Sequence, residues 1–587
     1  MFLLINHTGY VILKYESNPK GRIMIMARTV SVGTQSFSQI REEGSFLIDK
    51  TMLIKDWWDN KDSVTLIARP RRFGKTLNMN MLECFFSTEY SGRADLFEGM
   101  DIWDYEEFRN LQGTYPVISL SFAKLKNNSI DEMKADFCAI ITELLKRHKE
   151  TVYGSEVLDQ DDKDDFKDIL YLINRKKSYS EAKNAVAFLS SLLEKHYGKP
   201  VIILLDEYDT PLQEAYIGGF WNELVSFMRL FFNSTFKDNK YMYRSVMTGI
   251  TRVSRESLFS DMNNLELCTL SSVKYSEYFG FTEEEVFASM DEFGYTNKDE
   301  VKYWYDGFTV GDKTDIYNPW SVINFLDKGS LDTYWANTSS NSLVSSLIRE
   351  ADEEIKSDFE ELLSGGTIVK TVDDEMVFSQ LSESINFIWS LLSSSGYLKM
   401  KNVGEDLYEL QIVNYEVLKM FRNMVEGWFA SKTSKYSKLI KSLLNVQLED
   451  LNEYMNILTE SLMSSFDTGE NPNDFLAPEK FYHGFVLGLL VELRDSYSVK
   501  SNRESGIGRY DVMLIPKNRN DRAFIIEFKS VNRNRGEKSL ENALTNALKQ
   551  IEEFRYQQNL TDLGIPEENI VKYGFAFEGK KVLIGRG

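Results

Sequence analysis

The first half of the chain alternates between short apolar runs and longer amphipathic stretches. The runs are rich in Val, Ile and Leu and are too short for helices, so they predict buried strands. The amphipathic stretches between them predict helices that each place one face on a core. Strands that are apolar throughout and alternate with helices indicate a parallel sheet covered on both faces. The predicted strands span residues 63–68, 117–122, 201–205 and 243–248, and the first two helices span 77–87 and 130–148.

The second half of the chain has a different pattern. After about residue 275 it contains short helices and aromatic-rich turns such as Tyr305–Phe308 and Ile316–Trp320. Residues from about 375 to 470 are rich in Leu, Met and Glu and are predicted to be mostly helical. The loop Gly469–Asn473 marks the last predicted domain boundary. Beyond it we predict a helix at 479–497, strands at 510–515 and 523–528, and a helix at 540–557.

The composition is typical of a folded chain with several domains. Of the 587 residues 43% are hydrophobic and 13% are aromatic, which is more than disordered segments usually contain, and the length exceeds one core. No apolar run approaches the roughly 18 residues that suggest a membrane span. The three cysteines and four histidines are scattered, which argues against a zinc site or a disulfide framework and favours a cytoplasmic location.

The charge is distributed unevenly. A formal net charge of −21 argues against a protein that coats nucleic acid nonspecifically. Residues 500–587, however, hold 16 Lys and Arg against 12 Asp and Glu, which leaves a local charge of +4. A positively biased end on an acidic chain is a modest indication of a phosphate-bearing partner there.

A Gly-Lys-Thr tripeptide follows the first predicted strand and opens the next predicted helix. A phosphate loop needs backbone N–H groups at a helix N-terminus, a lysine on the outer phosphates and a hydroxyl on magnesium. Gly74, Lys75 and Thr76 supply these groups. The position of the first glycine in the general pattern holds Arg69 instead, so the prediction depends on the strand and helix around the tripeptide.

The strand at 201–205 ends in two acids, Asp206 and Glu207. A nucleoside-triphosphate site needs one carboxylate beside magnesium and a second that polarises the attacking water. We predict Asp206 for the first role, together with Thr76, and Glu207 for the second. Acids at a strand end can also be an ordinary solvated surface. Their occurrence with a phosphate loop, in the right order on alternating strands, favours the nucleotide site.

Further candidates follow the next predicted strand. Thr248 lies at its end, where a polar side chain can sense the γ-phosphate. Arg252 and Arg255 come shortly afterwards; either could stabilise charge in the transition state, and both could equally be surface arginines. The predicted nucleotide-binding residues are Arg72, Phe73, Gly74, Lys75, Thr76, Asp206 and Thr248.

Three segments, Phe46–Thr51, Arg69–Thr76 and Leu205–Asp209, together resemble the AAA-ATPase-like family common in bacteria and archaea. The phosphate loop of that family reads Arg-Pro-Arg-Arg-Phe-Gly-Lys-Ser/Thr, so Arg69 departs from the general motif and fits the family. The resemblance covers about residues 30–290 and implies a P-loop ATPase with ATP and Mg²⁺ as cofactors. It also implies an extra strand between the two motif strands, which we expect the strand at 117–122 to supply.

A second group of polar residues lies near the C-terminus. Glu527 and Lys529 are two apart on a predicted strand and therefore share a face. A hairpin turning near residues 517–521 would bring Asp511 beside Glu527. Carboxylates around divalent ions, with a lysine beside them, are what metal-dependent phosphodiester cleavage needs. The same letters also arise on the wet face of an edge strand, but Ile525–Ile526 indicates a buried strand, where charges are costly.

The segments Glu479–Gly484, Asn502–Asp511 and Ile526–Lys529 resemble the PD-(D/E)XK nuclease-like domain that commonly follows an AAA-ATPase-like domain. The resemblance covers about residues 476–587 and implies a restriction-endonuclease-like α/β fold. It implies Asp511, Glu527 and Lys529 as the catalytic residues, with Asp511 and Glu527 on the metal and Glu479 and Gln550 as supporting residues.

These features predict an α/β protein with an N-terminal P-loop domain, a helical middle and a C-terminal nuclease-like domain. We expect an ATP-binding, ATP-hydrolysing protein coupled to a Mg²⁺-dependent nuclease that acts on DNA or RNA in defence or mobile-element control. The alternative is a nucleotide-operated switch whose C-terminal domain binds nucleic acid or protein without cleavage. No membrane partner is expected, and a homo-oligomer is one option.

The expected segments are an N-terminal extension at 1–28 that an internal start would remove, the ATPase domain at 29–275, a lid or winged-helix-like region at 276–400, a helical linker at 401–475 and the nuclease-like domain at 476–587.

Overall fold

The computed structural model divides into two compact units. Unit 1 contains residues before 340 together with 370–416, and unit 2 contains 340–369 together with residues from 417 onward. The structure describes residues 28–250, 258–259, 262–335, 342–351, 353–372, 387–429, 433–466, 488, 493, 495–505, 508–531, 539–578 and 581–587.

Unit 1 contains a five-stranded parallel sheet in the order β2-β3-β4-β1-β5. Every residue of β1 and β3 is buried, as the uninterrupted apolar runs predict for strands covered on both faces. All four strands expected from the sequence are present. The strands are β1 (Val64–Ala68), β2 (Val117–Ser121), β3 (Val201–Asp206), β4 (Met242–Gly249) and β5 (Leu265–Cys268).

The position of β2 differs from the expectation. We expected the strand at 117–122 to lie between the two motif strands, β1 and β3. In the structure β4 lies there, pairing with β1 through Val64↔Ser245 and with β3 through Leu204↔Val246. β2 pairs with the outer side of β3. The extra strand of this sheet is therefore β4, the strand that carries Thr248.

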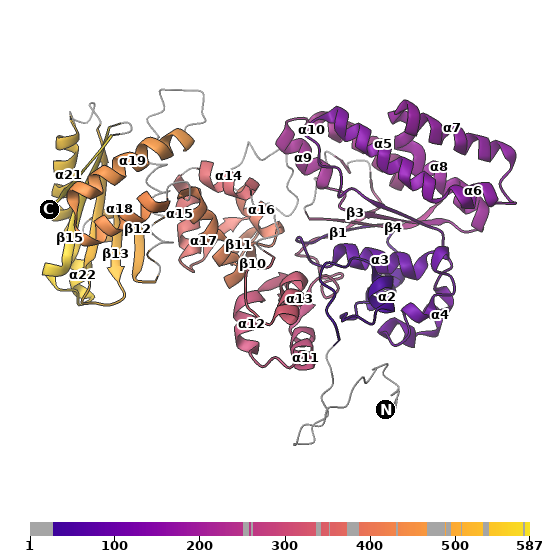
Figure 1. Ribbon diagram of the computed structural model, residues 1–587, viewed down its shortest axis with the longest axis horizontal. Coiled ribbons are helices and arrows are strands. Elements are labelled where there is room, and N and C mark those ends of the chain that lie inside the picture. Colours follow the sequence, from indigo (N-terminus) through magenta and orange to yellow (C-terminus); the bar gives the residue numbers. More distant parts are fainter. Residues whose placement is uncertain are drawn as a thin grey trace, which may run out of the picture. The chain divides into compact units, whose positions relative to one another are not determined.

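Helices cover both faces of this sheet (Figure 1). α5 and α8 pack on one face, in a core that includes Phe137 and Leu189. α2 and α3 pack on the other face with Trp57 and Phe85. The helices of this region are α1 (Phe37–Glu42), α2 (Met52–Asn60), α3 (Lys75–Phe86), α4 (Glu106–Leu111), α5 (Ile130–Arg147), α6 (Lys149–Gly154), α7 (Gln160–Lys176), α8 (Tyr179–Tyr197), α9 (Thr210–Gly218) and α10 (Trp221–Phe232).

The rest of unit 1 combines helices with two small sets of strands. The antiparallel sheet β6-β8-β7 lies beside a helix pair, α11 and α12. A second antiparallel pair, β10 with β11, occupies residues that we predicted to be helical. The elements are β6 (Phe281–Thr282), α11 (Glu283–Phe293), α12 (Lys298–Tyr305), β7 (Phe308–Val310), β8 (Lys313–Tyr317), α13 (Pro319–Lys328), α16 (Phe387–Ser394), β10 (Leu398–Asn402) and β11 (Leu407–Ile412).

Unit 2 is built on a five-stranded mixed sheet in the order β12-β13-β14-β15-β16. β14 and β15 are parallel and the other neighbours are antiparallel. The helix α21 follows β14 in the chain and packs on β14, β15 and β16. The elements are α14 (Ser342–Glu350), α15 (Glu353–Leu363), β9 (Ile368–Thr371, at the boundary with unit 1), α17 (Tyr415–Phe429, beginning at that boundary), α18 (Thr433–Asn445), α19 (Leu448–Phe466), β12 (Tyr497–Ser505), β13 (Gly508–Pro516), β14 (Ala523–Ser530), α21 (Leu540–Glu553), α22 (Gln557–Asp562), β15 (Ile570–Glu578) and β16 (Lys581–Arg586).

Two asparagines of α19 pair with the backbone of the edge strand β16. The Asn452 side chain accepts from the Ile584 N–H at 2.8 Å and donates to the Ile584 carbonyl at 2.9 Å. Asn456 makes the same two bonds with Val582, at 2.9 and 2.7 Å. An edge strand leaves N–H and C=O groups that need partners. α19 is therefore part of the packed structure of this unit.

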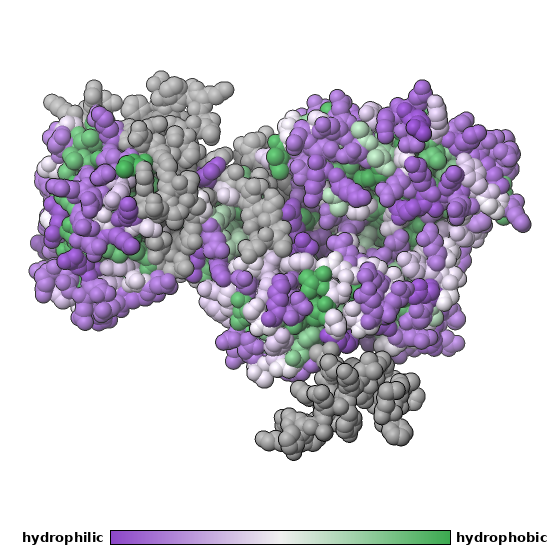
Figure 2. All heavy atoms as spheres, in the orientation of Figure 1, coloured by the Kyte–Doolittle hydropathy of each residue, from purple (hydrophilic) through white to green (hydrophobic). Residues whose placement is uncertain are grey.

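The surface is largely hydrophilic on the face in Figure 2, with hydrophobic residues in small, scattered groups. Among the helices of the described ranges, none is both long enough and apolar enough to cross a bilayer.

Candidate functional site

The chain between β1 and α3 forms a loop with unusual backbone angles. Gly74, directly before α3, has φ of 78°, and Arg72 has φ of 66°. This left-handed conformation is disfavoured for residues other than glycine. Successive backbone N–H groups in such turns can form an anion-binding concavity. This loop lies at the N-terminus of a helix, where anions are also stabilised.

Arg69 ties the start of the loop to two strands. Its backbone N–H donates to the Gly249 carbonyl at 3.0 Å, at the end of β4. Its guanidinium donates to the carbonyls of Cys268 at 3.0 Å and Thr269 at 2.6 Å, at the end of β5. Burial lowers the pKa of Arg69 to about 10. A buried side chain that bonds carbonyl oxygens thus stands where the general motif has a glycine.

Lys75 is buried and its ammonium faces the loop. Its Nζ donates to the carbonyls of Arg69 at 2.9 Å and Pro70 at 2.7 Å. Burial lowers its pKa to about 8, and the charges of Asp206 and Asp209 oppose that shift. A lysine held in a concave loop at a helix N-terminus can reach phosphate oxygens.

Asp206 makes hydrogen bonds with three other predicted site residues. Thr76 on α3 donates to its Oδ2 at 2.6 Å, and Thr248 on β4 donates to its Oδ1. The backbone N–H of Glu207 donates to Oδ1 at 3.0 Å. A carboxylate and a threonine hydroxyl in contact are the oxygen ligands that Mg²⁺ uses in phosphate sites. The residues present therefore fit magnesium at this position.

Glu207 follows Asp206 in a left-handed conformation, with φ of 53°. Its carboxylate accepts a hydrogen bond from the Thr210 hydroxyl at 3.1 Å. Such strain persists only where the surrounding structure imposes it, and it is frequent at functional sites. The hydrogen bond from Thr210 therefore restrains the carboxylate of the residue that directly follows Asp206.

Asp209 belongs to the same region, and our sequence prediction gave it no role. Its side chain is buried, and its Oδ2 accepts from the Ile250 N–H at 2.9 Å and from Gln213 at 3.1 Å. The sequence did contain a signal for Asp209, because it is the third acidic residue in a run of four that begins at Asp206. Arg252 and Arg255 lie outside the described residues, so their predicted roles stay predictions.

The second predicted site lies on neighbouring strands of unit 2. β13 and β14 pair antiparallel through Val512↔Ile526, which places Asp511 next to Glu527. Asp511 Oδ2 accepts from the backbone N–H of Phe528 at 2.7 Å. The Lys529 ammonium lies 3.7 Å from Glu527 Oε1. Phe528 faces the other way and packs on Phe575, with ring centroids 5.1 Å apart. The structure thus brings Asp511, Glu527 and Lys529 together.

Glu527 is the most unusual group of this site. Its side chain is 1% exposed, and its Oε2 has no hydrogen-bond partner among the described residues. Burial, followed by the negative charge of Asp511, raises the pKa of Glu527 to about 9. A buried carboxylate oxygen without a partner is costly in a folded protein. A divalent cation would supply the missing partner, so the residues present fit a metal.

Gln550 on α21 holds the other oxygen of Glu527. Its Nε2 donates to Glu527 Oε1 and also lies 3.3 Å from the hydroxyl of the buried Tyr556. This hydrogen bond restrains the orientation of the carboxylate, and the supporting role of Gln550 stays a prediction. Glu479 lies outside the described residues.

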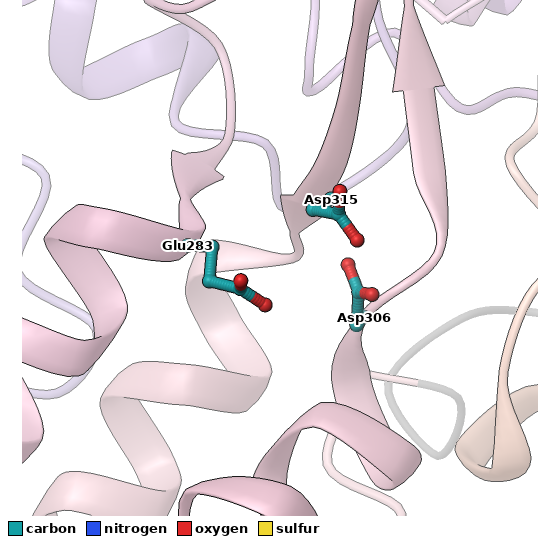
Figure 3. A group of neighbouring side chains, drawn as sticks. All are labelled: Glu283, Asp306 and Asp315. Carbon is teal, nitrogen blue, oxygen red and sulfur yellow. The ribbon is translucent and has the colours of Figure 1, made fainter.

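A third acidic group lies in unit 1 and was not predicted. Glu283, Asp306 and Asp315 point toward one another (Figure 3), with carboxylate oxygens within 4.8 Å. The Lys302 ammonium contacts Glu283 and lies 3.1 Å from Asp315 and 3.9 Å from Asp306. Burial raises the pKa of Asp306 to about 7. Lys302 supplies the cation of this cluster from within the protein.

Two family models match this chain. Residues 31–259 match the family described as predicted AAA-ATPase, and residues 477–587 match the PD-(D/E)XK nuclease superfamily. A protein of Azotobacter chroococcum mcd 1, described as an uncharacterized protein in the vnfD 5' region, is 22% identical over 523 residues. That alignment covers 86% of this chain and 90% of that protein.

Proposed function

We propose that this chain, which joins an AAA-ATPase-like domain to a PD-(D/E)XK nuclease superfamily domain, is an ATPase that controls a metal-dependent nuclease. The observation that carries the nuclease part is the buried carboxylate of Glu527, whose Oε2 is without a hydrogen-bond partner among the described residues. A folded protein retains such a group where function requires it. DNA or RNA is the proposed substrate.

The proposed nucleotide site uses the Asp206 cluster. Thr76 and Asp206 would hold Mg²⁺, and Lys75 would bind the outer phosphates. Glu207, oriented by Thr210, would position and polarise the attacking water. Thr248, which donates to Asp206, would respond to the γ-phosphate through that bond.

In the proposed nuclease site Asp511 and Glu527 would hold a divalent cation, which when bound polarises the phosphate and acidifies water. The Lys529 ammonium, 3.7 Å from Glu527 Oε1, would stabilise negative charge on the phosphate or orient the water. Gln550 would keep Glu527 in one rotamer by its hydrogen bond to Oε1. A nuclease must be restrained from the cell's own nucleic acid. An attached ATPase therefore fits a role in defence or mobile-element control.

The experiment incubates the purified full chain with plasmid, single-stranded DNA and RNA in Mg²⁺ or Mn²⁺, with and without ATP. Asp511→Ala and Lys529→Ala should both abolish cleavage. Lys549→Ala, which removes an exposed lysine of α21, is the control and should cleave like the wild type. Cleavage that survives both site substitutions, or no cleavage by the wild type under any condition, would refute the nuclease proposal.

The second candidate is a nucleotide-operated switch whose C-terminal domain binds nucleic acid or protein without cutting. One observation favours it: the proposed nuclease site brings together two carboxylates, Asp511 and Glu527. In the described residues of unit 2, no group of three acids lies close enough together to share an ion. The switch predicts nucleic-acid or protein binding that changes with ATP while cleavage is absent from the same assay.

A further inference from the structure

The phosphate loop is in contact with a second part of unit 1 along most of its length. We define the α11–β11 module as residues 281–335 and 387–416. A Cβ on Gly396 would lie 2.8 Å from Pro70 Cγ, so the two residues pack without space between them. The rings of Phe73 and Phe308 have centroids 4.9 Å apart.

The two residues between Pro70 and Phe73 also contact this module. The Asn318 side chain donates to the Arg71 carbonyl at 3.4 Å. The Arg72 guanidinium lies over the ring of Trp320, 4.2 Å from its centroid. Four consecutive residues of the loop therefore touch one module, although the sequence separates them from it by more than 200 residues.

The two polar contacts come from one helix start. Asn318 caps α13, because its Oδ1 accepts from the N–H groups of Trp320 at 2.9 Å and Ser321 at 3.3 Å. The same side chain holds the Arg71 carbonyl through its Nδ2. Asn318 is buried. Its two roles fix the indole of Trp320 relative to the loop backbone.

The Arg72–Trp320 contact bears on the shape of the loop. Arg72 has φ of 66°, a backbone conformation that an arginine rarely adopts without external support. Trp320 stacks on the guanidinium of the residue that takes this conformation. Cation–π contact with tryptophan is the strongest of its kind. The contact thus joins the residue that takes the left-handed turn to a helix outside the loop.

We infer that Trp320 is a positioning residue for the phosphate loop: by stacking on Arg72 it holds the left-handed turn that aims the backbone N–H groups at phosphate. The inference rests on the proposed function for its catalytic consequence, since nucleotide is the expected phosphate ligand. It also makes the α11–β11 module sensitive to the nucleotide. Any movement of Arg72 on phosphate binding changes the contact with α13.

The test compares the full-length wild type with Trp320→Leu, Trp320→Phe and the control Phe287→Leu. The control removes the ring of another cation–π pair in the same module, Lys298 over Phe287 at 5.2 Å. Hydrogen exchange of residues 69–76 is measured without nucleotide, and ATP–Mg²⁺ binding and turnover are measured separately. Trp320→Leu should speed exchange in the loop and weaken ATP binding about three- to tenfold, with a smaller change in kcat. Trp320→Phe should lie within about twofold of the wild type because a ring face remains.

A double-mutant cycle with Arg72→Gly tests whether Trp320 acts on the loop through Arg72. Glycine adopts the left-handed turn without support, so Trp320→Leu should have no further effect in that background. Equal effects of Trp320→Leu in both backgrounds, no effect in either, or an equal effect of Phe287→Leu would overturn the inference. If loop exchange responds as expected and the wild type binds no nucleotide, the proposed function fails and the positioning role of Trp320 stands.

Discussion

Replacing Glu527 by glutamine should stabilise the sheet of unit 2, by an amount that grows with pH. The pKa of this carboxyl is about 9 in the folded protein against an ordinary value of 4.5. At low pH the group is protonated whether the chain is folded or unfolded, so it contributes no difference. As pH rises past 4.5, the unfolded chain loses the proton that the folded chain retains, and stability falls. Glutamine removes this loss and retains the contact with Gln550.

The size of the effect follows from the pKa difference. Three pH units between pH 5 and pH 8 correspond to a ceiling of about 4 kcal/mol at 1.36 kcal/mol per unit. Asp511 carries part of the charge interaction with Glu527, so we expect about 2 kcal/mol, close to thirtyfold in an opening equilibrium. Native-state hydrogen exchange of β14 in metal-free buffer at pH 5, 6.5 and 8, corrected for intrinsic rates, measures this local free energy.

Glu553→Gln is the matched control, because Glu553 ends the adjacent helix α21 and its side chain is 58% exposed. It should leave the pH dependence of β14 unchanged. Identical pH dependence of the opening free energy in the wild type and Glu527→Gln would refute the argument that a buried, protonated carboxyl occupies this site. A Glu527→Gln protein less stable than the wild type at pH 8 would refute it equally.

Three further results are expected. Asp306→Asn should stabilise unit 1 increasingly between pH 4 and pH 7. The pKa of Asp306 is about 7 against an ordinary 3.8, so folding takes up a proton there over this pH range. Hydrogen exchange of β7 at each pH measures the stability difference between variant and wild type, and a difference that does not change with pH would contradict the prediction. Thr210→Val should lower kcat for ATP hydrolysis about three- to tenfold with little change in ATP binding, since it removes one hydrogen bond that orients Glu207; equal loss in both would indicate general disruption. Asn456→Ala should cost about 2 kcal/mol in β16, because the Val582 N–H and C=O both lose a partner, and unchanged exchange of residues 581–586 would contradict it.

The buried strands of unit 1 could be predicted because their apolar runs are uninterrupted and each is followed by a turn or a polar site residue. Their order could not. β4 lies between β1 and β3, and nothing in the composition of β2 or β4 distinguishes an outer from an inner position, since both are largely buried. The hairpin of β10 and β11 was predicted as helix, although Leu398 and Met400 follow a strand-like alternation; the surrounding Leu- and Met-rich helical pattern concealed it.

The two candidate sites differed in how far the sequence could predict them. Asp511 and Glu527 were expected to be neighbours because a short turn and a period of two fix the register of a hairpin, and the structure places them together. The burial of Glu527 follows from Ile525 and Ile526 on the same strand. The contact of Arg72 with Trp320 had no local signal, because it joins residues 248 positions apart through packing of a whole module.

The central claim is that the nucleotide site controls the nuclease site, and the direct test is the cleavage rate of one nucleic-acid substrate with and without ATP. The account predicts that ATP–Mg²⁺ changes the rate for the wild type and leaves it unchanged for Lys75→Ala, whose loop lacks the ammonium for the phosphates. A rate that is the same with and without ATP for the wild type, or an ATP effect of equal size in Lys75→Ala, would contradict it.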